Sequence, residues 1–229
     1  MIYAHKMASD RQELHDFLLR ACHDMRTRLR AVRTNAELLI EAPEKYQRAE
    51  RAGILQFLVD GARSADSLVD GILNYVLALQ VQQNFSSIST AVLLRGALGK
   101  LEVEIRDSGA QISYGEMPQI TGDPDRLMQL FENLLRNAIQ HRGEAPPCIQ
   151  VSARLQSSEW LFAIRDNGPG IEAEDLERIF RPFERLRRDH QRAGLGLAIC
   201  REIVTAHRGR IWAESVVGSG TTVFFALGS

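Results

Sequence analysis

The sequence has few cysteines, few aromatic residues and no long apolar run. Its three cysteines, Cys22, Cys148 and Cys200, lie far apart without Cys-x-x-Cys spacing, which argues against a disulfide framework or a zinc site and suits a reducing compartment. No apolar run approaches the roughly 18 residues that a membrane-spanning helix needs, and the N-terminus lacks the apolar stretch of a signal peptide. We therefore expect a cytoplasmic protein with no membrane segment in this chain.

An excess of charge of one sign is also missing, because 28 Lys and Arg residues are balanced by 29 Asp and Glu residues. This balance argues against a protein held to nucleic acid mainly by bulk positive charge, and we expect no nucleic-acid partner. In contrast, 45% of the 229 residues are hydrophobic, which is enough for a sizeable core in one large domain or two small ones.

Residues 1–84 have the apolar spacing of two long helices. Steps of four and three residues alternate along a first seam, which consists of Leu18, Cys22, Met25, Leu29, Val32, Ala36 and Leu39. Pro43 marks a turn at residues 42–44. A second seam with the same alternation follows through Ile54, Leu58, Gly61, Ala65, Leu68, Ile72, Tyr75 and Leu79. Two long helices joined by a short turn predict an antiparallel helical hairpin.

The predicted hairpin has more apolar residues than two helices can bury. The additional residues, off both seams, are Leu19, Phe57, Val69, Leu73 and Val76. A second copy that completes a four-helix bundle would cover them, and so would the rest of the same chain. We favour the homodimer, because a two-helix scaffold has little core of its own.

Residues 85–229 have the mixed pattern of an α/β domain, after a polar stretch at residues 82–87 that predicts a linker. One helix is expected to start with Asp123 as its N-cap and Pro124 at its first position. The other predicted elements are helices at 90–104 and 195–206 and strands at 111–114, 149–155, 160–165, 211–214 and 221–227. The predicted fold class is therefore α+β, with a helical hairpin followed by an α/β sandwich that has a mixed sheet and helices on one face.

Three polar motifs in this second half combine into one candidate site. Asn133 and Asn137 are four residues apart and so share a helix face, and an asparagine oxygen can ligate Mg²⁺. Asp166-Asn167-Gly168-Pro169-Gly170 follows a strand, where glycines admit close backbone approach and the carboxylate can accept from an amino group. Gly194-Leu195-Gly196 begins a helix, whose free N–H groups favour phosphate. Each motif alone is weak, but their combination in this order is much less expected by chance.

This combination, with Gly218-Ser219-Gly220-Thr221 before the last strand, resembles the ATP-binding domain shared by sensor histidine kinases, DNA gyrase, Hsp90 and MutL. The run from Ile179 to Leu186, IFRPFERL, is similar to the phenylalanine-rich box of the histidine kinases. In the first helix, the run from His23 to Leu29, HDMRTRL, resembles their phosphoacceptor box, usually His-Glu/Asp-Leu-Arg-Thr-Pro-Leu. The chain thus resembles the transmitter core of a sensor histidine kinase, of the type common in phytochrome-like and hybrid kinases.

The resemblance implies an enzyme, an autophosphorylating protein histidine kinase of a two-component system. His23 would be the nucleophile, Asp24 would orient it and accept its proton, and Thr27 would help to place water for dephosphorylating the partner. Asn133 would face the phosphates. The phosphoryl group would then pass to an aspartate of a response-regulator receiver domain. An upstream sensor domain, or a sensor partner, outside this chain would supply the signal.

The resemblance also implies ATP and Mg²⁺ as cofactors. The residues that would bind them are Asn137 as the Mg²⁺ ligand, Asp166 at the adenine amino group, Gly168 and Gly170 around the adenine pocket, Gly194 and Gly196 at the phosphates, and Thr221 in support of the adenine site.

Three residues depart from the family pattern. Arg28 replaces the usual proline, which predicts a straighter helix after His23. Gln140 stands where Lys or Arg usually touches phosphate, and Arg192 changes the start of the glycine lid. These departures leave open a histidine phosphotransferase with a degenerate ATP domain, or a phosphatase-biased scaffold. A gyrase-type ATPase is a further alternative, which Asn133, the phenylalanine box and His23 oppose.

Overall fold

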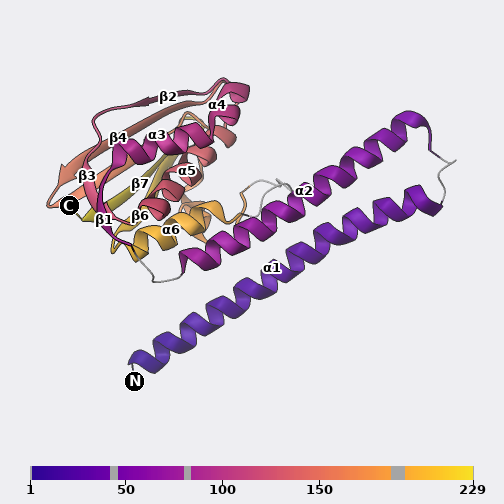
Figure 1. Ribbon diagram of the computed structural model, residues 1–229, viewed down its shortest axis with the longest axis horizontal. Helices are drawn as coiled ribbons and strands as arrows, with labels where there is room; N and C mark the ends of the chain where they lie inside the picture. Colours follow the sequence, from indigo (N-terminus) through magenta and orange to yellow (C-terminus); the bar gives the residue numbers. More distant parts are fainter. Residues whose placement is uncertain (1, 42–45, 80–83, 187–193, 229) are drawn as a thin grey trace. The chain divides into compact units, whose positions relative to one another are not determined.

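The computed structural model describes residues 2–41, 46–79, 84–186 and 194–228. The chain divides into two compact units, Met1–Leu73 with Arg187–Gly194 and Asn74–Leu186 with Leu195–Ser229 (Figure 1). The turn predicted at residues 42–44, Arg192 and most of the predicted glycine lid lie outside the described residues. In the described part of the chain, no helix is long and apolar enough to cross a bilayer.

The first unit is built from α1 (Ile2–Glu41) and most of α2 (Arg48–Ala78), which run antiparallel (Figure 1). The second predicted seam is confirmed over most of its length, since Ala65 and Leu68 are buried, but its last residue, Leu79, is exposed. The two helices approach closely at Gly61, where an added Cβ would lie only 2.7 Å from a methyl carbon of Val32. The first seam is confirmed only in part, because Leu18 and Leu29 are exposed in this single chain.

Arg28 joins the two helices of the hairpin. The helix α1 continues through this residue without a break, as predicted from the absence of proline. The Arg28 guanidinium donates to the backbone oxygen of Ser64 at 2.6 Å and also to the Ser64 hydroxyl. Ser64 is buried, so this charged hydrogen bond lies at least partly out of water. The sequence did not predict this contact.

The second unit is built on a five-stranded sheet in the order β2-β4-β5-β7-β6. The strands are β2 (Gln111–Tyr114), β4 (Cys148–Gln156), β5 (Glu159–Arg165), β6 (Arg210–Val216) and β7 (Gly220–Gly228). Strands β2 and β4 pair in parallel, and the other neighbours pair antiparallel. The sheet is therefore mixed, and the predicted α/β sandwich is confirmed.

The core of this unit lies between the sheet and two helices, α5 (Pro124–Gln140) and α6 (Gly196–Ala206) (Figure 1). The Phe131 ring of α5 meets Phe162 of β5 and Phe225 of β7 edge-on, at centroid distances of 6.0 and 5.7 Å. Phe162 and Phe225 stack at 4.6 Å, and all three rings are fully buried. These aromatic contacts hold α5 on the sheet face from which the strand-end side chains emerge.

Two of our predictions for this unit are wrong. Ser86 and Ser87 were assigned to the linker, but they begin β1 (Ser86–Ser89), which pairs antiparallel with β3 (Gln119–Gly122). The single helix predicted at 90–104 is interrupted at Leu101, so that it forms α3 (Thr90–Lys100) and α4 (Glu102–Ser108). Leu101 is fully buried, and its packing overrides the helical pattern. Two short 3-10 helices, η2 (Ala173–Asp175) and η3 (Arg178–Phe180), were also not predicted.

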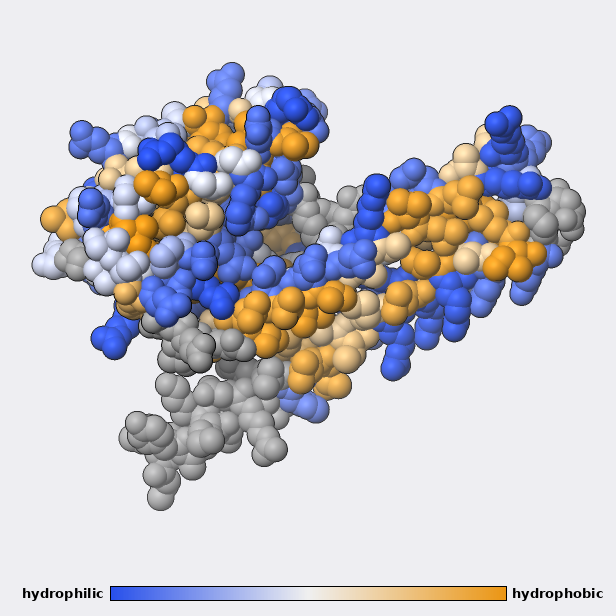
Figure 2. Space-filling view, in the orientation of Figure 1, coloured by the Kyte–Doolittle hydropathy of each residue, from blue (hydrophilic) through white to orange (hydrophobic). Residues whose placement is uncertain are grey.

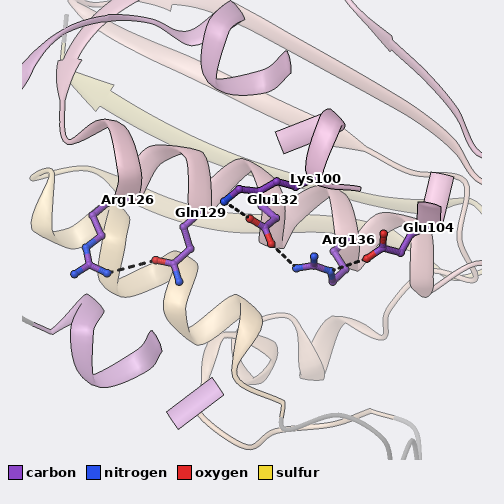
Figure 3. Close-up of polar contacts among 6 residues, drawn as sticks. All are labelled: Lys100, Glu104, Arg126, Gln129, Glu132 and Arg136. Carbon is purple, nitrogen blue, oxygen red and sulfur yellow. Dashed lines mark hydrogen bonds and ion pairs between the residues drawn. The ribbon is translucent and has the colours of Figure 1, made fainter. Parts of the chain in front are cut away.

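A chain of ion pairs joins α3, α4 and α5 on the outer side of α5 (Figure 3). Glu132 pairs with Lys100 at 3.2 Å and with Arg136 at 2.9 Å, and Arg136 pairs with Glu104 at 3.5 Å. The start of the same helix is capped as predicted, because the Asp123 carboxylate accepts the N–H groups of residues 125 and 126. Helix α5 is thus fixed at its start, on its outer side and through its aromatic core.

His207 contacts both Asp123, the residue before α5, and the ring of Phe85. Its Nε2 accepts the backbone N–H of Asp123 at 3.0 Å, and its Nδ1 lies 2.7 Å from the Ile203 carbonyl, to which it must donate. The ring stacks on Phe85 at 4.8 Å, and Asn84 donates its N–H to the Asp123 carboxylate. An Nε2 that accepts a hydrogen bond carries no proton, so this imidazole is neutral. Burial lowers the pKa of His207 accordingly.

We predict that acid destabilises the second unit through His207. Because its pKa is lowered in the folded state, the unfolded chain binds the proton more tightly, and the free energy of unfolding should fall as the pH drops below about 6.5. Urea unfolding followed by the fluorescence of Trp160 and Trp212, which both lie in this unit, would measure the fall. His207→Gln should reduce the dependence, whereas the exposed control His141→Gln should keep it. Equal pH dependence in all three proteins would contradict the prediction.

Candidate functional site

The candidate site centres on Asp166, which directly follows β5. Its Oδ1 accepts the N–H groups of Gly168 at 2.8 Å and Thr221 at 3.1 Å, while its own N–H donates to the Thr221 carbonyl at 2.9 Å. Within the described parts of the chain, Oδ2 has no hydrogen-bond partner. Burial raises the pKa of Asp166, and the two backbone hydrogen bonds oppose this rise. A partly buried carboxylate with one unpaired oxygen is suited to accept from a ligand amino group.

The glycines of the loop after Asp166 are sterically required. An added Cβ on Gly168 would collide with the carbonyl oxygen of His141, the residue that follows α5. Gly170 has a φ of +74°, and an added Cβ there would collide with the carbonyl oxygen of Val216. The loop is therefore held between the end of α5 and the β6–β7 turn.

Asn167 holds this loop in a way that the sequence analysis missed. Its side-chain oxygen accepts the N–H of Cys148 at 2.8 Å, and its Nδ2 donates to the Pro146 carbonyl at 3.1 Å. Only an amide presents a donor and an acceptor side by side, so Asn167 adds one rung beyond the β4–β5 ladder. The position of Asn167 directly after the candidate aspartate could have pointed to this role. Its partners, however, are about 20 residues away in the sequence, so the sequence does not identify them.

Asn133 and Asn137 lie one turn apart on α5 of the same unit, as predicted. The Asn133 Nδ2 is buried and has no hydrogen-bond partner among the described residues. An orphaned amide of this kind costs about 1–3 kcal/mol, and a ligand oxygen would remove that cost. The described residues contain no cluster of three or more His, Cys, Asp or Glu side chains that could hold a metal. A hard cation here would therefore rely on an asparagine oxygen together with ligand phosphates, which fits Mg²⁺.

The predicted phosphate glycines have different surroundings. Gly196 is the first residue of α6, and no side chain caps this helix start, so its free N–H groups can bind an anion. An added Cβ at Gly196 would meet nothing within 4 Å, so this glycine leaves open space. Gly194 has a φ of +67°, which favours glycine, and is assigned to the first unit. The structure thus gathers Asp166, Gly168, Gly170 and Thr221, while the two asparagines and Gly196 lie on the helices of the same unit.

His23 lies on the surface of α1 in the hairpin unit. Its side chain is 80% exposed, and its Nδ1 lies 3.6 Å from Oδ1 of Asp24. The Thr27 hydroxyl donates to the His23 carbonyl at 3.0 Å. His23 can therefore be reached from solvent and has a carboxylate close enough to take up a proton after a small side-chain rotation.

An acceptor for an amino group, a glycine-shaped loop and an orphaned amide on a neighbouring helix are groups in this α/β domain that a bound ligand would satisfy. The family described as histidine kinase-, DNA gyrase B-, and HSP90-like ATPase matches residues 122–228, and these residues belong to it. Relatives with named roles then specify the class further. They include named histidine kinases, so the predicted resemblance to the histidine kinases is confirmed.

Two relatives and one solved structure illustrate this similarity. Cyanobacterial phytochrome A of Nostoc sp. is 36% identical over 98% of this chain and 30% of its own length. The methanogenesis regulatory histidine kinase FilI of Methanothrix harundinacea is 30% identical over 94% of this chain and 24% of its own length. This chain thus spans less than a third of either relative. The fold is shared with histidine kinase ThkA in complex with response regulator protein TrrA, at 23% identity and a TM-score of 0.74, covering 98% of this chain and 64% of that one.

We predict that Asp166→Asn separates ligand binding from stability. The affinity for ADP should fall at least about tenfold, since the charged acceptor is lost. The free energy of unfolding at pH 7 should stay equal or rise, because the raised pKa of Asp166 means that its ionised form destabilises the fold. Calorimetry with ADP and urea unfolding followed by tryptophan fluorescence would measure the two quantities. The exposed Asp107→Asn is the control, and a variant that loses stability but not affinity would refute this role.

Proposed function

We propose that this chain is the catalytic core of an ATP-dependent protein histidine kinase, which phosphorylates His23 and passes the phosphoryl group to an aspartate of a response regulator. The observation that carries the proposal is the presence, in one chain, of an exposed histidine beside a carboxylate and an ATPase-family domain with unsatisfied ligand-binding groups. The histidine kinases among the relatives, and the fold shared with a kinase that was crystallised with its response regulator, support it.

The hairpin would supply the nucleophile. With the Nδ1 proton directed to Asp24, the Nε2 lone pair of neutral His23 attacks the γ-phosphorus. The N–P bond forms as the bond between the γ-phosphorus and the bridging oxygen breaks, and ADP leaves with that electron pair. The ring becomes positively charged in this step, and Asp24 takes the Nδ1 proton. Thr27 lies one helical turn further along the same face, in position to help place water for the reverse loss of phosphate.

The ATPase-family domain would position the nucleotide. Asp166, supported by Thr221, would accept a hydrogen bond from the adenine amino group. The unpaired amide of Asn133 would donate to the phosphates. Mg²⁺, held by Asn137 and the phosphates, would neutralise charge on the transferred group. The glycines Gly194 and Gly196 let the lid backbone approach the phosphates. Since an asparagine amide cannot take up a proton, Asn133 cannot activate water as a general base, which favours transfer to histidine over hydrolysis.

The apolar surface of the hairpin supports a homodimer. Figure 2 shows hydrophobic residues gathered along both helices. The large exposed residues are Leu18, Leu19, Leu29, Leu38, Ile40, Leu55, Phe57, Val59, Val69 and Leu73. A second hairpin would bury this surface in a four-helix bundle. We place the functional boundary between hairpin and ATP domain near residue 84, the site of action in the cytoplasm, and the sensor in another domain or partner.

The histidine phosphotransferase alternative explains less of the structure. A relay protein without ATP has no use for the buried unpaired amide of Asn133, which is unfavourable without a ligand, or for the unpaired oxygen of Asp166. The phosphatase-biased scaffold has only Thr27 in its favour.

Labelling with γ-phosphate-labelled ATP and Mg²⁺ tests the proposal. We expect acid-labile, alkali-stable label on the wild type and none on His23→Gln, because the variant side chain has no nucleophilic nitrogen. His15→Gln, also exposed on α1, is the matched control and should keep its label. Absence of ADP binding to the wild type by calorimetry would overturn the kinase in favour of the relay protein, and label remaining on His23→Gln would move the phosphorylation site.

Sedimentation at micromolar concentration tests the dimer. Val69→Glu should shift the chain toward the monomer by at least about tenfold in the dissociation constant, because a charge would be buried against its own copy. Ser67→Glu, on nearly the opposite side of α2, should leave the dimer intact. A monomeric wild type would rule out the bundle.

A further inference from the structure

Ser215 of β6 contacts the loop that follows Asp166, and its hydroxyl group has three hydrogen-bond partners. It pairs with Thr221 of β7 in the strand register. Its Oγ lies 2.9 Å from the backbone nitrogen of Ile171, 2.8 Å from the carbonyl oxygen of Gly220 and 3.0 Å from Oγ1 of Thr221. Ser215 therefore connects the end of the glycine loop to the start of β7, and neither the motifs nor the proposed function assigned it a role.

Counting protons fixes the direction of each of these bonds. The N–H of Ile171 can only donate, and the carbonyl of Gly220 can only accept. The single proton of Ser215 therefore points to the Gly220 carbonyl, since two oxygens 2.8 Å apart would otherwise repel each other. The bond between the two hydroxyls then needs its proton from Thr221. The Thr221 hydroxyl donates to Ser215, and its remaining lone pairs can only accept.

This acceptor belongs to the same strand-end cluster as the Asp166 carboxylate. The backbone N–H of Thr221 donates to Asp166 Oδ1, and the strand alternation places Asp166, Thr221 and Ser215 on the sheet face that carries Phe162 and Phe225. The cluster thus combines the unpaired Oδ2 of Asp166 with a threonine oxygen whose donor proton is already used. Both groups favour a direct hydrogen bond from a ligand N–H and disfavour a ligand carbonyl.

We propose that Ser215 is a positioning residue for purine selectivity: by accepting the Thr221 hydroxyl proton, it makes the site favour a 6-aminopurine over a 6-oxopurine. The inference rests on the proposed function, because it assumes that a purine nucleotide binds at Asp166. If Ser215 loses its hydroxyl, the Thr221 hydroxyl rotates freely and can donate to a 6-oxo group. The selectivity should therefore change, and not only the affinity.

Calorimetry with ADP and IDP, which differ at position 6 of the purine, tests the proposal. The measured quantity is the ratio of the IDP to the ADP dissociation constant. We expect a preference for ADP in the wild type and a ratio about 3- to 10-fold smaller in Ser215→Ala, the worth of one hydrogen bond. Ser215→Thr keeps the hydroxyl and should keep the ratio. Thr221→Val should lower the ratio by itself, and adding Ser215→Ala to it should change little, because Ser215 acts through the Thr221 hydroxyl.

The outcomes distinguish this inference from the proposed function. If the wild type binds neither nucleotide, the proposed function fails, and the inference fails with it. If the wild type prefers ADP but Ser215→Ala weakens ADP and IDP equally, Ser215 is only a structural tie and the inference alone is overturned. Tryptophan fluorescence checks that each variant is folded. If Ser215→Ala does not fold, an unchanged ratio in Thr221→Val overturns the inference.

Discussion

The pairing of β5 with β7 is the interaction on which the site depends. The ladder runs from Glu159 opposite Gly228 to Arg165 opposite Thr222, and Asp166 extends it through its N–H bond to the Thr221 carbonyl. The Asp166 carboxylate then binds back to the Thr221 N–H, so one residue serves both the sheet and the site. A slip of one residue in this register would turn the carboxylate to the other face of the sheet.

Helix α5 supplies the second constraint, because it carries the two asparagines past the same sheet face. Different contacts hold the different parts of this helix. Asp123 caps its start, Phe131 packs on its inner side, and Glu132 forms ion pairs on its outer side. Exposed ion pairs are individually weak, but this set includes half-buried Arg136 and links three helices. The carbonyl of His141, which follows the helix, then meets Gly168, so that helix and loop position each other.

The parts of this structure that local pattern determines were predictable from the sequence. The cap at Asp123 depends on residues only two and three positions away. The apolar spacing that marks the strands and helices of the second half likewise depends only on residues close together in the sequence. Gly168 and Gly170 were predictable from their motif, and backbone packing excludes a side chain at both positions. Features that depend on distant partners were missed: the Leu101 break depends on burial, and Arg28–Ser64, Asn167–Pro146 and Ser215–Ile171 join residues far apart in the sequence. The serine-rich β1 is too short to show a period, and it is a strand only because β3 pairs with it.

Arg28, which stands where the family pattern predicted from the sequence has proline, affects how often the hairpin is bent. A proline removes one backbone hydrogen bond and makes a bend in α1 easy, whereas Arg28 keeps that bond and adds a charged one to Ser64. Any bend that separates the helices at this level has to break the added bond, at a cost of about 1.5–3 kcal/mol. The bent form is then roughly ten- to a hundredfold rarer than it would be without that contact. In this chain a bend of α1 at the level of His23 therefore has to break a contact across the hairpin.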